Sequence, residues 1–254
     1  MSFGSPRTFH RLSAGVEDAG FELRDMLVWL YGQGYPKTRN LTGEWEGWGT
    51  GLKPAYEPIL LARRAPDGLI ADNVTRHHTG ALHIDACRVA DRRWPPNLLL
   101  GHSQDCTDTS CADGCPIDGL GDRARFFYCA KPGRRERDAG CELLPRRTIQ
   151  TFKIGREDEL KAESEGTLNV HPTAKPIELM RWLVRLLCAP DALVLDPFAG
   201  SGSTGAAAVL EGARFLGFER ENDYAQIARA RIKHHAKNRP ERTQASPQPM
   251  DARP

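Results

Sequence analysis

The sequence has no long apolar run and little excess charge of either sign. No apolar run approaches the 18 residues that a membrane-spanning helix needs, and no signal peptide opens the chain. We therefore expect a cytoplasmic protein that does not contact a membrane. The net charge is only +2, so any binding of nucleic acid must depend on a local basic patch, because the bulk charge is too small to attract it.

The sequence also contains no Cys-x-x-Cys pair, although it has seven cysteines. An odd number of cysteines in a cytoplasmic chain favours free thiols or a metal site over disulfides. The 254 residues are 40% hydrophobic and 27% charged, which is ordinary for a soluble globular protein. This length suffices for one domain, or for one domain with an insertion.

Residues 192–219 hold the most informative pattern, ALVLDPFAGSGSTGAAAVLEGARFLGFE. An apolar run ends at Asp196, a glycine-rich turn and a small-residue helix follow, and a second apolar run ends at Glu219. This order is typical of a βαβ unit in an open parallel sheet. Ligands of such sheets bind beyond the carboxyl ends of the strands, where we expect the two acids and the glycine turn to converge.

The residue types in this unit suit a nucleotide-like ligand. Gly200 and Gly202 let the backbone approach a ligand closely. Ser203 and Thr204 open a helix whose first N–H groups are free to bind ligand oxygens. Glu219 stands about where a Rossmann unit keeps the acid that binds ribose hydroxyls.

A dinucleotide such as NAD is a competing ligand, because residues 200–205 also match the fingerprint GxGxxG. The sequence Asp196-Pro197-Phe198 argues against it, since dinucleotide glycines normally follow the strand directly. An acid at the strand end can pair with a cationic amino group, which S-adenosylmethionine has and NAD lacks. A plain βα turn without a ligand would leave the glycines and both acids unexplained.

Apolar spacing elsewhere predicts further elements. Two tryptophans, Trp45 and Trp48, suit either stacking on a base or anchoring a glycine-rich loop. Pro176 is well placed to begin a helix that packs on the sheet beside the glycine turn. The other expected elements are a strand ending at Phe3, helices over 8–19 and 222–232, and strands over 21–31, 59–62, 98–100 and 126–130.

Between residues 66 and 170 the pattern breaks into short runs separated by turn residues, which indicates an inserted recognition region. The later part of this region is locally basic. Such a stretch suits phosphate contacts that position a protein on DNA, and an ordinary solvated face is the alternative. Its basic residues are Arg123, Arg125, Lys131, Arg134, Arg135, Arg137, Arg146 and Arg147.

The same region contains His102, Cys106, Cys111 and Cys115 within a short span. One imidazole and three thiolates form a complete tetrahedral set for structural zinc. The spacing lacks the usual Cys-x-x-Cys, so unrelated free thiols are the alternative.

Three stretches together resemble one enzyme family. The segment HPTAKP with its following helix, the turn LDPFAGSGSTG and the strand FLGFE occur in that order. They closely resemble the amino-methylating DNA methyltransferases of prokaryotes and their phages, which methylate N6 of adenine or N4 of cytosine with S-adenosylmethionine. The segments FGSPRTFHRL, EWEGWGTGLKPAYEPILLARR and RFFYCAK are similar to other parts of this family, so the resemblance covers most of residues 1–235.

The resemblance implies a fold and a set of cofactor-binding residues. The segment order is that of the circularly permuted β group, which implies a doubly wound α/β, Rossmann-like sheet of the class I S-adenosylmethionine-dependent methyltransferases. The implied partner is double-stranded DNA. The residues implied to bind S-adenosylmethionine are His171, Thr173, Lys175, Asp196, Phe198, Gly200, Gly202, Ser203, Thr204 and Glu219.

The resemblance also suggests a division of the chain. Residues 1–65 correspond to part of the catalytic half, 66–170 to the target-recognition region and 171–235 to the cofactor-binding half. Residues 236–254 are rich in Lys, Arg, Pro and Gln, which predicts a disordered tail.

The chain departs from the family on the acceptor side. The family's [DNS]PP[YFW] loop accepts hydrogens of the target amino group and stacks on the base, and no such motif occurs here. The segment Gly4-Ser5-Pro6-Arg7 lacks the second proline and the aromatic residue, so the catalytic residues stay unassigned. We consider three explanations: a misassigned start codon, a gene fragment, or an upstream polypeptide that supplies the missing catalytic strand.

The leading prediction is a site-specific DNA methyltransferase acting on the exocyclic amino group of adenine (N6) or cytosine (N4), and we expect the chain alone to be catalytically impaired. One alternative is a non-catalytic remnant that binds DNA or S-adenosylmethionine. The other is a dinucleotide-dependent oxidoreductase, which rests on the GxGxxG match alone.

Overall fold

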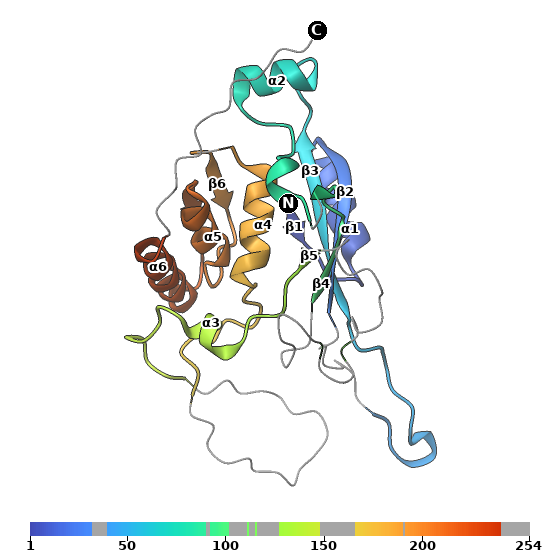
Figure 1. Ribbon diagram of the computed structural model, residues 1–254. Helices are drawn as coiled ribbons and strands as arrows, with labels where there is room; N and C mark the ends of the chain where they lie inside the picture. The colour runs from blue at the N-terminus through green and yellow to red at the C-terminus, as the bar shows by residue number, and fades with distance from the viewer. Residues whose placement is uncertain are drawn as a thin grey trace.

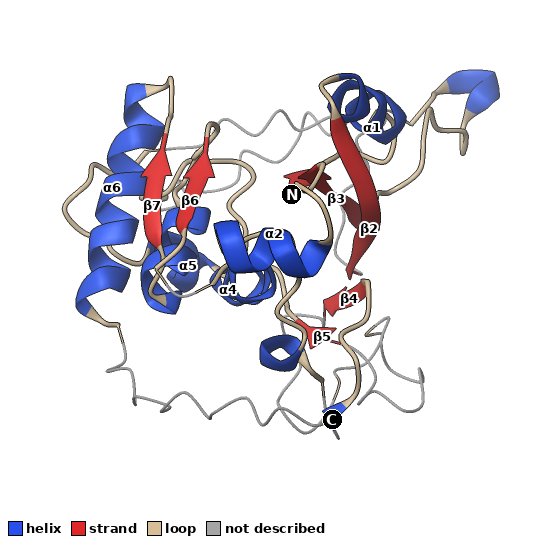
Figure 2. Ribbon diagram, turned by 90° about the horizontal axis from the view of Figure 1, so that it is seen from above, coloured by secondary structure: helices blue, strands red, loops and turns tan. Residues whose placement is uncertain are grey.

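The computed structural model describes residues 1–31, 40–89, 92–101, 111, 115, 127–147, 166–189 and 191–239. Within these ranges the strands form two sheets, one of five strands and one of two. Helix α4 (Ile177–Leu187) lies between the sheets (Figure 1). Seen from above, the two-stranded sheet and the larger sheet lie on opposite sides of the molecule (Figure 2).

The larger sheet is mixed, with strand order β1-β3-β2-β4-β5. Strand β3 (Tyr56–Arg64) runs antiparallel to both β1 (Ser2–Phe3) and β2 (Phe21–Tyr31). Strands β2, β4 (Leu98–Gly101) and β5 (Phe127–Tyr128) are parallel to one another. Helix α1 (Phe9–Asp18) connects β1 to β2, as its apolar spacing predicts.

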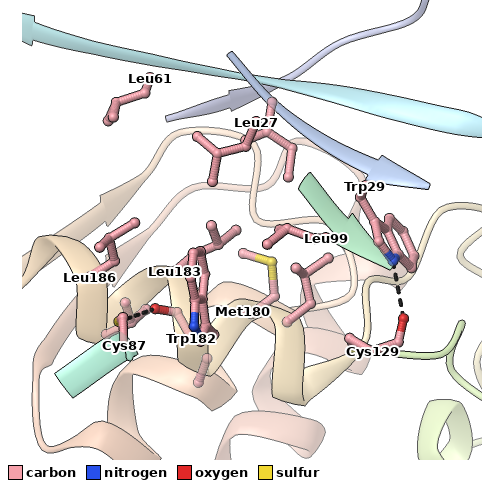
Figure 3. Packing of buried hydrophobic residues seen from close by; sticks show 14 of the residues in the cluster. Leu27, Trp29, Leu61, Cys87, Leu99, Cys129, Met180, Trp182, Leu183 and Leu186 are labelled. Carbon is pink, nitrogen blue, oxygen red and sulfur yellow. Dashed lines mark hydrogen bonds between the residues drawn. The ribbon is translucent and has the colours of Figure 1, made fainter. Parts of the chain in front are cut away.

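Strand β2 shows why this segment becomes a sheet strand. In its second half the side chains of Leu27, Trp29 and Tyr31 are buried and alternate with less buried neighbours, which is the period of a pleated strand. The indole N–H of Trp29 donates to the carbonyl oxygen of Cys129 at 3.1 Å (Figure 3). This hydrogen bond satisfies the polar atom of a large buried side chain.

The smaller sheet is the βαβ unit that the sequence predicts. Strands β6 (Leu193–Asp196) and β7 (Arg214–Gly217) pair in parallel, and helix α5 (Ser203–Glu211) connects them. Helix α6 (Asn222–Lys237) packs against α5. The carboxyl ends of β6 and β7 therefore bring Asp196 and Gly217 side by side.

Helix α4 provides the core that joins the two sheets. Its buried residues Leu179, Met180 and Leu183 belong to the same cluster as Leu27 and Leu99 of the larger sheet (Figure 3). The cluster also includes Ala207 of α5. The remaining side of α4 is a narrow polar stripe, where Glu178 pairs with Arg181 and Arg185, so most of the helix surface is apolar and buried.

Two strands inside the range 66–170 extend the larger sheet, since β4 pairs with β2 and β5 pairs with β4. The same range contains helix α2 (Ile70–His77) and the short helix α3 (Arg134–Asp138). Two 3-10 turns, η1 (Gly43–Trp45) and η2 (Asp85–Cys87), complete the described elements. The division into four parts stays a prediction.

Strand β3 is longer than the expected 59–62, because it pairs with β2 almost from end to end. The C-terminal helix likewise continues past residue 232 to Lys237. Residues 240–254, which hold most of the expected disordered tail, lie outside the described residues. Within the described part of the chain, no helix combines the length and apolar character needed to cross a membrane.

Candidate functional site

The glycine turn after β6 lies between the ring of His171 and helix α6. Gly200 and Gly202 have φ values of +52° and +74°, a region that favours glycine. A Cβ atom at Gly200 would lie 2.6 Å from Nε2 of His171, and one at Gly202 would lie 2.8 Å from Cα of Ala228. Any side chain at either position would therefore displace the turn or its neighbours.

Glu219 fastens the turn from the end of β7. Its Oε2 atom accepts the N–H of Gly200 at 2.8 Å, and its Oε1 atom accepts the N–H of Glu221 at 2.9 Å. Hydrogen bonds from backbone N–H groups, of which that from Glu221 has the largest effect, hold the pKa of Glu219 below its usual value. The ionised carboxylate can accept further hydrogen bonds, since its two oxygens offer about four lone-pair directions.

His171 contacts the turn in its neutral form, because burial lowers the pKa of its imidazole. Its ring meets that of Tyr224 edge to face at 4.6 Å between centroids. Its backbone is held by Asn169, whose Oδ1 accepts the His171 N–H at 3.0 Å, and by Arg137, whose Nη2 donates to the His171 carbonyl at 2.9 Å. The sequence analysis did not single out Asn169, which is fully buried.

Lys175, in the segment before α4, links that segment to the larger sheet. Its Nζ atom lies 3.0 Å from Oε2 of Glu57 on β3 and 3.2 Å from the carbonyl oxygen of Thr173. Its own carbonyl accepts the hydroxyl of Ser203 at 2.9 Å. Burial and the carboxylate of Glu57 raise the pKa of Tyr31 to about 12, so its phenol stays protonated and donates to Glu57 at 3.5 Å.

Asp196 and Phe198 form the outer side of the turn. The Oδ1 atom of Asp196 accepts the N–H of Phe198 at 3.0 Å. The side chain of Phe198 is 86% exposed, so its ring is available to a ligand. An exposed aromatic ring beside an acid and a glycine turn suits a ligand that has both a flat ring and a cationic group.

A cleft of about 760 Å³ separates β6 and the glycine turn from β1. Apolar side chains of α4, among them Met180, Leu183 and Val184, line part of it. Two predicted cofactor-binding residues do not line it: Gly202, which lies within the turn, and Glu219, which hydrogen-bonds to the turn. The other eight all line the cleft: His171, Thr173, Lys175, Asp196, Phe198, Gly200, Ser203 and Thr204.

The four candidate zinc ligands are described only in part. His102 and Cys106 lie outside the described residues. Cys115 is buried against Leu100 at the end of β4, and Cys111 packs against the same pair. No group of three potential metal ligands occurs in the part of the chain that the structure describes.

The basic stretch is partly used for internal contacts. Arg134 and Arg146 each donate to the carbonyl oxygen of Gly166 at 3.1 Å, and Arg147 pairs with Asp223. Arg137 holds His171, as described above. Arg123 and Arg125 lie outside the described residues.

The sequence analysis also missed Arg231, which contacts the turn from α6. The pattern that could have indicated its role is the helical spacing that places Arg231 on the same face as the apolar residues Ile227 and Ala228. A charged residue on the apolar face of a helix needs a buried partner, and here that partner is the glycine turn.

Replacing Gly202 by alanine should lower the free energy of unfolding by at least about 2 kcal/mol, since the left-handed conformation alone costs a residue with a Cβ about 1–2 kcal/mol. The contact with Ala228 adds to this cost. Gly15→Ala is the control, because a Cβ atom there meets nothing within 4 Å and the position lies in α1. It should instead stabilise the protein by up to about 1 kcal/mol. Urea denaturation measures both, and equal effects would contradict the assigned turn geometry.

Comparison with known proteins identifies the family. Residues 1–230 match the model of the N6_N4_Mtase family, described as DNA methylase. The Type II methyltransferase M.HindIII of Haemophilus influenzae is 25% identical over 245 residues, which are 91% of this chain and 61% of that protein. The chain thus spans about three fifths of the length of this relative.

The solved structure of PvuII DNA methyltransferase (cytosine-N4-specific) has the same fold. It aligns with a TM-score of 0.51 at 20% identity, over 90% of this chain and 57% of that one. This likeness confirms the predicted α/β methyltransferase fold class, while the circular permutation stays a prediction. With a family match that extends over nearly the whole length, the chain belongs to the DNA methylase family.

Proposed function

We propose that this chain takes part in transferring a methyl group from S-adenosylmethionine to the exocyclic amino group of adenine (N6) or cytosine (N4) in DNA. The observation that carries the proposal is the glycine turn, held by Glu219 and His171 at the carboxyl ends of β6 and β7. Membership of the DNA methylase family supports it. M.HindIII, a relative over most of the chain, is a Type II methyltransferase.

The residues around the turn fit S-adenosylmethionine. Asp196 offers a carboxylate to its ammonium group, and Glu219 keeps lone pairs for the ribose hydroxyls. No side chain caps the start of α5, so its first N–H groups suit the methionine carboxylate. His171, Thr173 and Lys175 would line the methionine end. When bound, the cofactor supplies an electrophilic methyl group.

The acceptor is a base that must leave the duplex to reach such a pocket. Its amino nitrogen has to lie in line with the methyl group, which demands a rigid site. The pair formed by Lys175 and Glu57 lies beside Phe3, and the Lys175 Nζ atom is 5.0 Å from the centre of that ring. These residues connect the two walls of the cleft and so fix its width.

We further propose that an additional strand, carrying the base-binding loop, runs along the free edge of β6 between β6 and β1 and leaves the end of the cleft at the glycine turn to the cofactor. Among the described strands β6 pairs only with β7, so its other edge is open toward β1. Leu193, Leu195 and Leu216 are each about half exposed. They alternate along β6 and β7 with Val194 and Phe215, which pack toward the helices, so they lie on the opposite face. Parallel sheets are normally covered on both faces, so a helix following the added strand would cover these residues.

Double-stranded DNA is the proposed partner. Arg134, Arg135 and Arg146 surround a hollow on the surface near α3, together with His234. Positive side chains of this kind suit phosphate groups, which position a protein without reading sequence. Asp138 and Glu142 line the same hollow and reduce its net charge.

Titration calorimetry tests the cofactor. The chain should bind S-adenosylmethionine and not NAD. Asp196→Asn and Glu219→Gln should each weaken binding by about tenfold to one-hundredfold, the loss expected for a hydrogen bond to a charged group. Glu17→Gln on the exposed face of α1 is the control and should have no effect. Binding of NAD without S-adenosylmethionine would overturn the assignment.

Transfer of tritiated methyl groups to duplex DNA tests the reaction. We expect little turnover by residues 1–254 alone, and turnover when a polypeptide carrying a [DNS]PP[YFW] strand is added or fused. A matched polypeptide with that motif changed to alanines should not restore it. Robust turnover by the isolated chain would refute the need for the added strand, whereas cofactor binding without transfer in any combination would favour a non-catalytic protein.

A structural zinc held by His102, Cys106, Cys111 and Cys115 is a separate proposal. The packing of Cys111 and Cys115 against Leu100 supports it, because it places two of the four residues together. Mass spectrometry of purified protein should find about one zinc per chain. Cys115→Ser should lose the metal and Cys188→Ser should keep it. Less than about a tenth of an equivalent in the unmodified protein would end the proposal.

A further inference from the structure

Arg231 of α6 is completely buried beneath the glycine turn. Its Nη1 atom donates to the carbonyl oxygen of Ser201 at 2.7 Å and to the hydroxyl oxygens of Ser201 and Ser203, each at 3.1 Å. One guanidinium nitrogen therefore touches the turn at three points. The Ser203 hydroxyl in turn donates a hydrogen bond to the carbonyl oxygen of Lys175.

A buried guanidinium is costly, because arginine keeps its charge under all ordinary conditions. Burial lowers the pKa of Arg231, and the carboxylates of Glu136 and Asp138 on α3 only partly offset this effect. The Nε and Nη2 atoms of Arg231 are also buried, without hydrogen-bond partners among the described residues. A buried charge with incomplete hydrogen bonding adds little to the stability of a fold. We therefore infer that the contacts of Arg231 with the turn serve a purpose other than stability.

The geometry of the turn shows what Arg231 contributes. The first helical bond of α5 joins the Ala206 N–H to the Gly202 carbonyl at 2.9 Å. The carbonyl one residue earlier, that of Ser201, is instead drawn toward α6 by Arg231. The Ser201 carbonyl is therefore hydrogen-bonded on the side of the turn that packs on α6. Gly200, Ser203 and Thr204 line the cleft on the other side.

We propose that Arg231 is a positioning residue for the cofactor turn. It fixes the turn from beneath in the shape that binds S-adenosylmethionine, and it does not touch the ligand. Glu219 and His171 hold the turn at Gly200, whereas Arg231 holds it at Ser201 and Ser203. This inference rests on the proposed function, because it takes the turn as the cofactor site.

The test combines cofactor affinity with local backbone protection in the full chain. Arg231→Gln should weaken binding of S-adenosylmethionine by about tenfold to one-hundredfold, because it removes charged hydrogen bonds to the turn. Arg231→Lys should recover part of the affinity, since it keeps the charge and one donor direction. Arg229→Gln on the exposed side of the same helix should bind like the unmodified chain.

A stability control separates positioning from general loosening. Leu186→Ala removes a buried side chain of α4 and should lower the melting temperature while leaving cofactor affinity unchanged. The proposal is overturned if Leu186→Ala loses as much affinity as Arg231→Gln, or if Arg231→Gln binds within about threefold of the unmodified chain. If Arg231→Gln does not fold, amide exchange in Arg231→Lys decides, and exchange at residues 200–204 no faster than in the unmodified chain overturns the proposal.

Amide hydrogen exchange distinguishes this inference from the proposed function. In the absence of any cofactor, exchange at residues 200–204 should be faster in Arg231→Gln than in the unmodified chain, while exchange in α4 should not change. If the unmodified chain fails to bind S-adenosylmethionine, the proposed function fails and exchange alone decides whether Arg231 positions the turn. Unchanged exchange at residues 200–204 would refute the role of Arg231.

Discussion

The burial of helix α4 is the constraint on which the rest of the structure depends. Its apolar side chains pack against β2 and β4 on one side and against α5 on the other. The first N–H group of α4, that of Ile177, is also engaged, since Glu136 of α3 accepts it at 2.6 Å. Because one helix is shared by both sheets, its position sets where the glycine turn lies relative to β1.

The turn itself is held by side chains from three directions. Glu219 binds it from β7, His171 packs on it from the segment before α4, and Arg231 binds it from α6. Each contact restrains a backbone that contains two left-handed glycines, the residue type with the most conformational freedom. A turn restrained in this way can present N–H groups to a ligand without the loss of conformational entropy that ordering on binding would cause.

The βαβ unit could be predicted from the sequence because its signals are local. The apolar runs, the glycines and the small-residue helix are neighbours in sequence, and two of the three stretches that carry the resemblance to DNA methyltransferases lie in this unit. The contact of Lys175 with Glu57 and that of Arg231 with Ser201 join residues far apart in the chain. No periodicity encodes such pairs, so they appear only once the core has brought their elements together.

The open edge of β6 and the exposed leucines beside it have one physical cause. A strand in a parallel sheet needs a hydrogen-bonding neighbour on each side and an apolar cover on each face. In the described structure β7 supplies one neighbour and α5 one cover, while the opposite edge and face of β6 meet the cleft and solvent. The glycine turn lies at the end of that same strand. A segment that paired with this edge of β6 would therefore also bring its own loop to the turn. The same segment would then complete both the sheet and the proposed site.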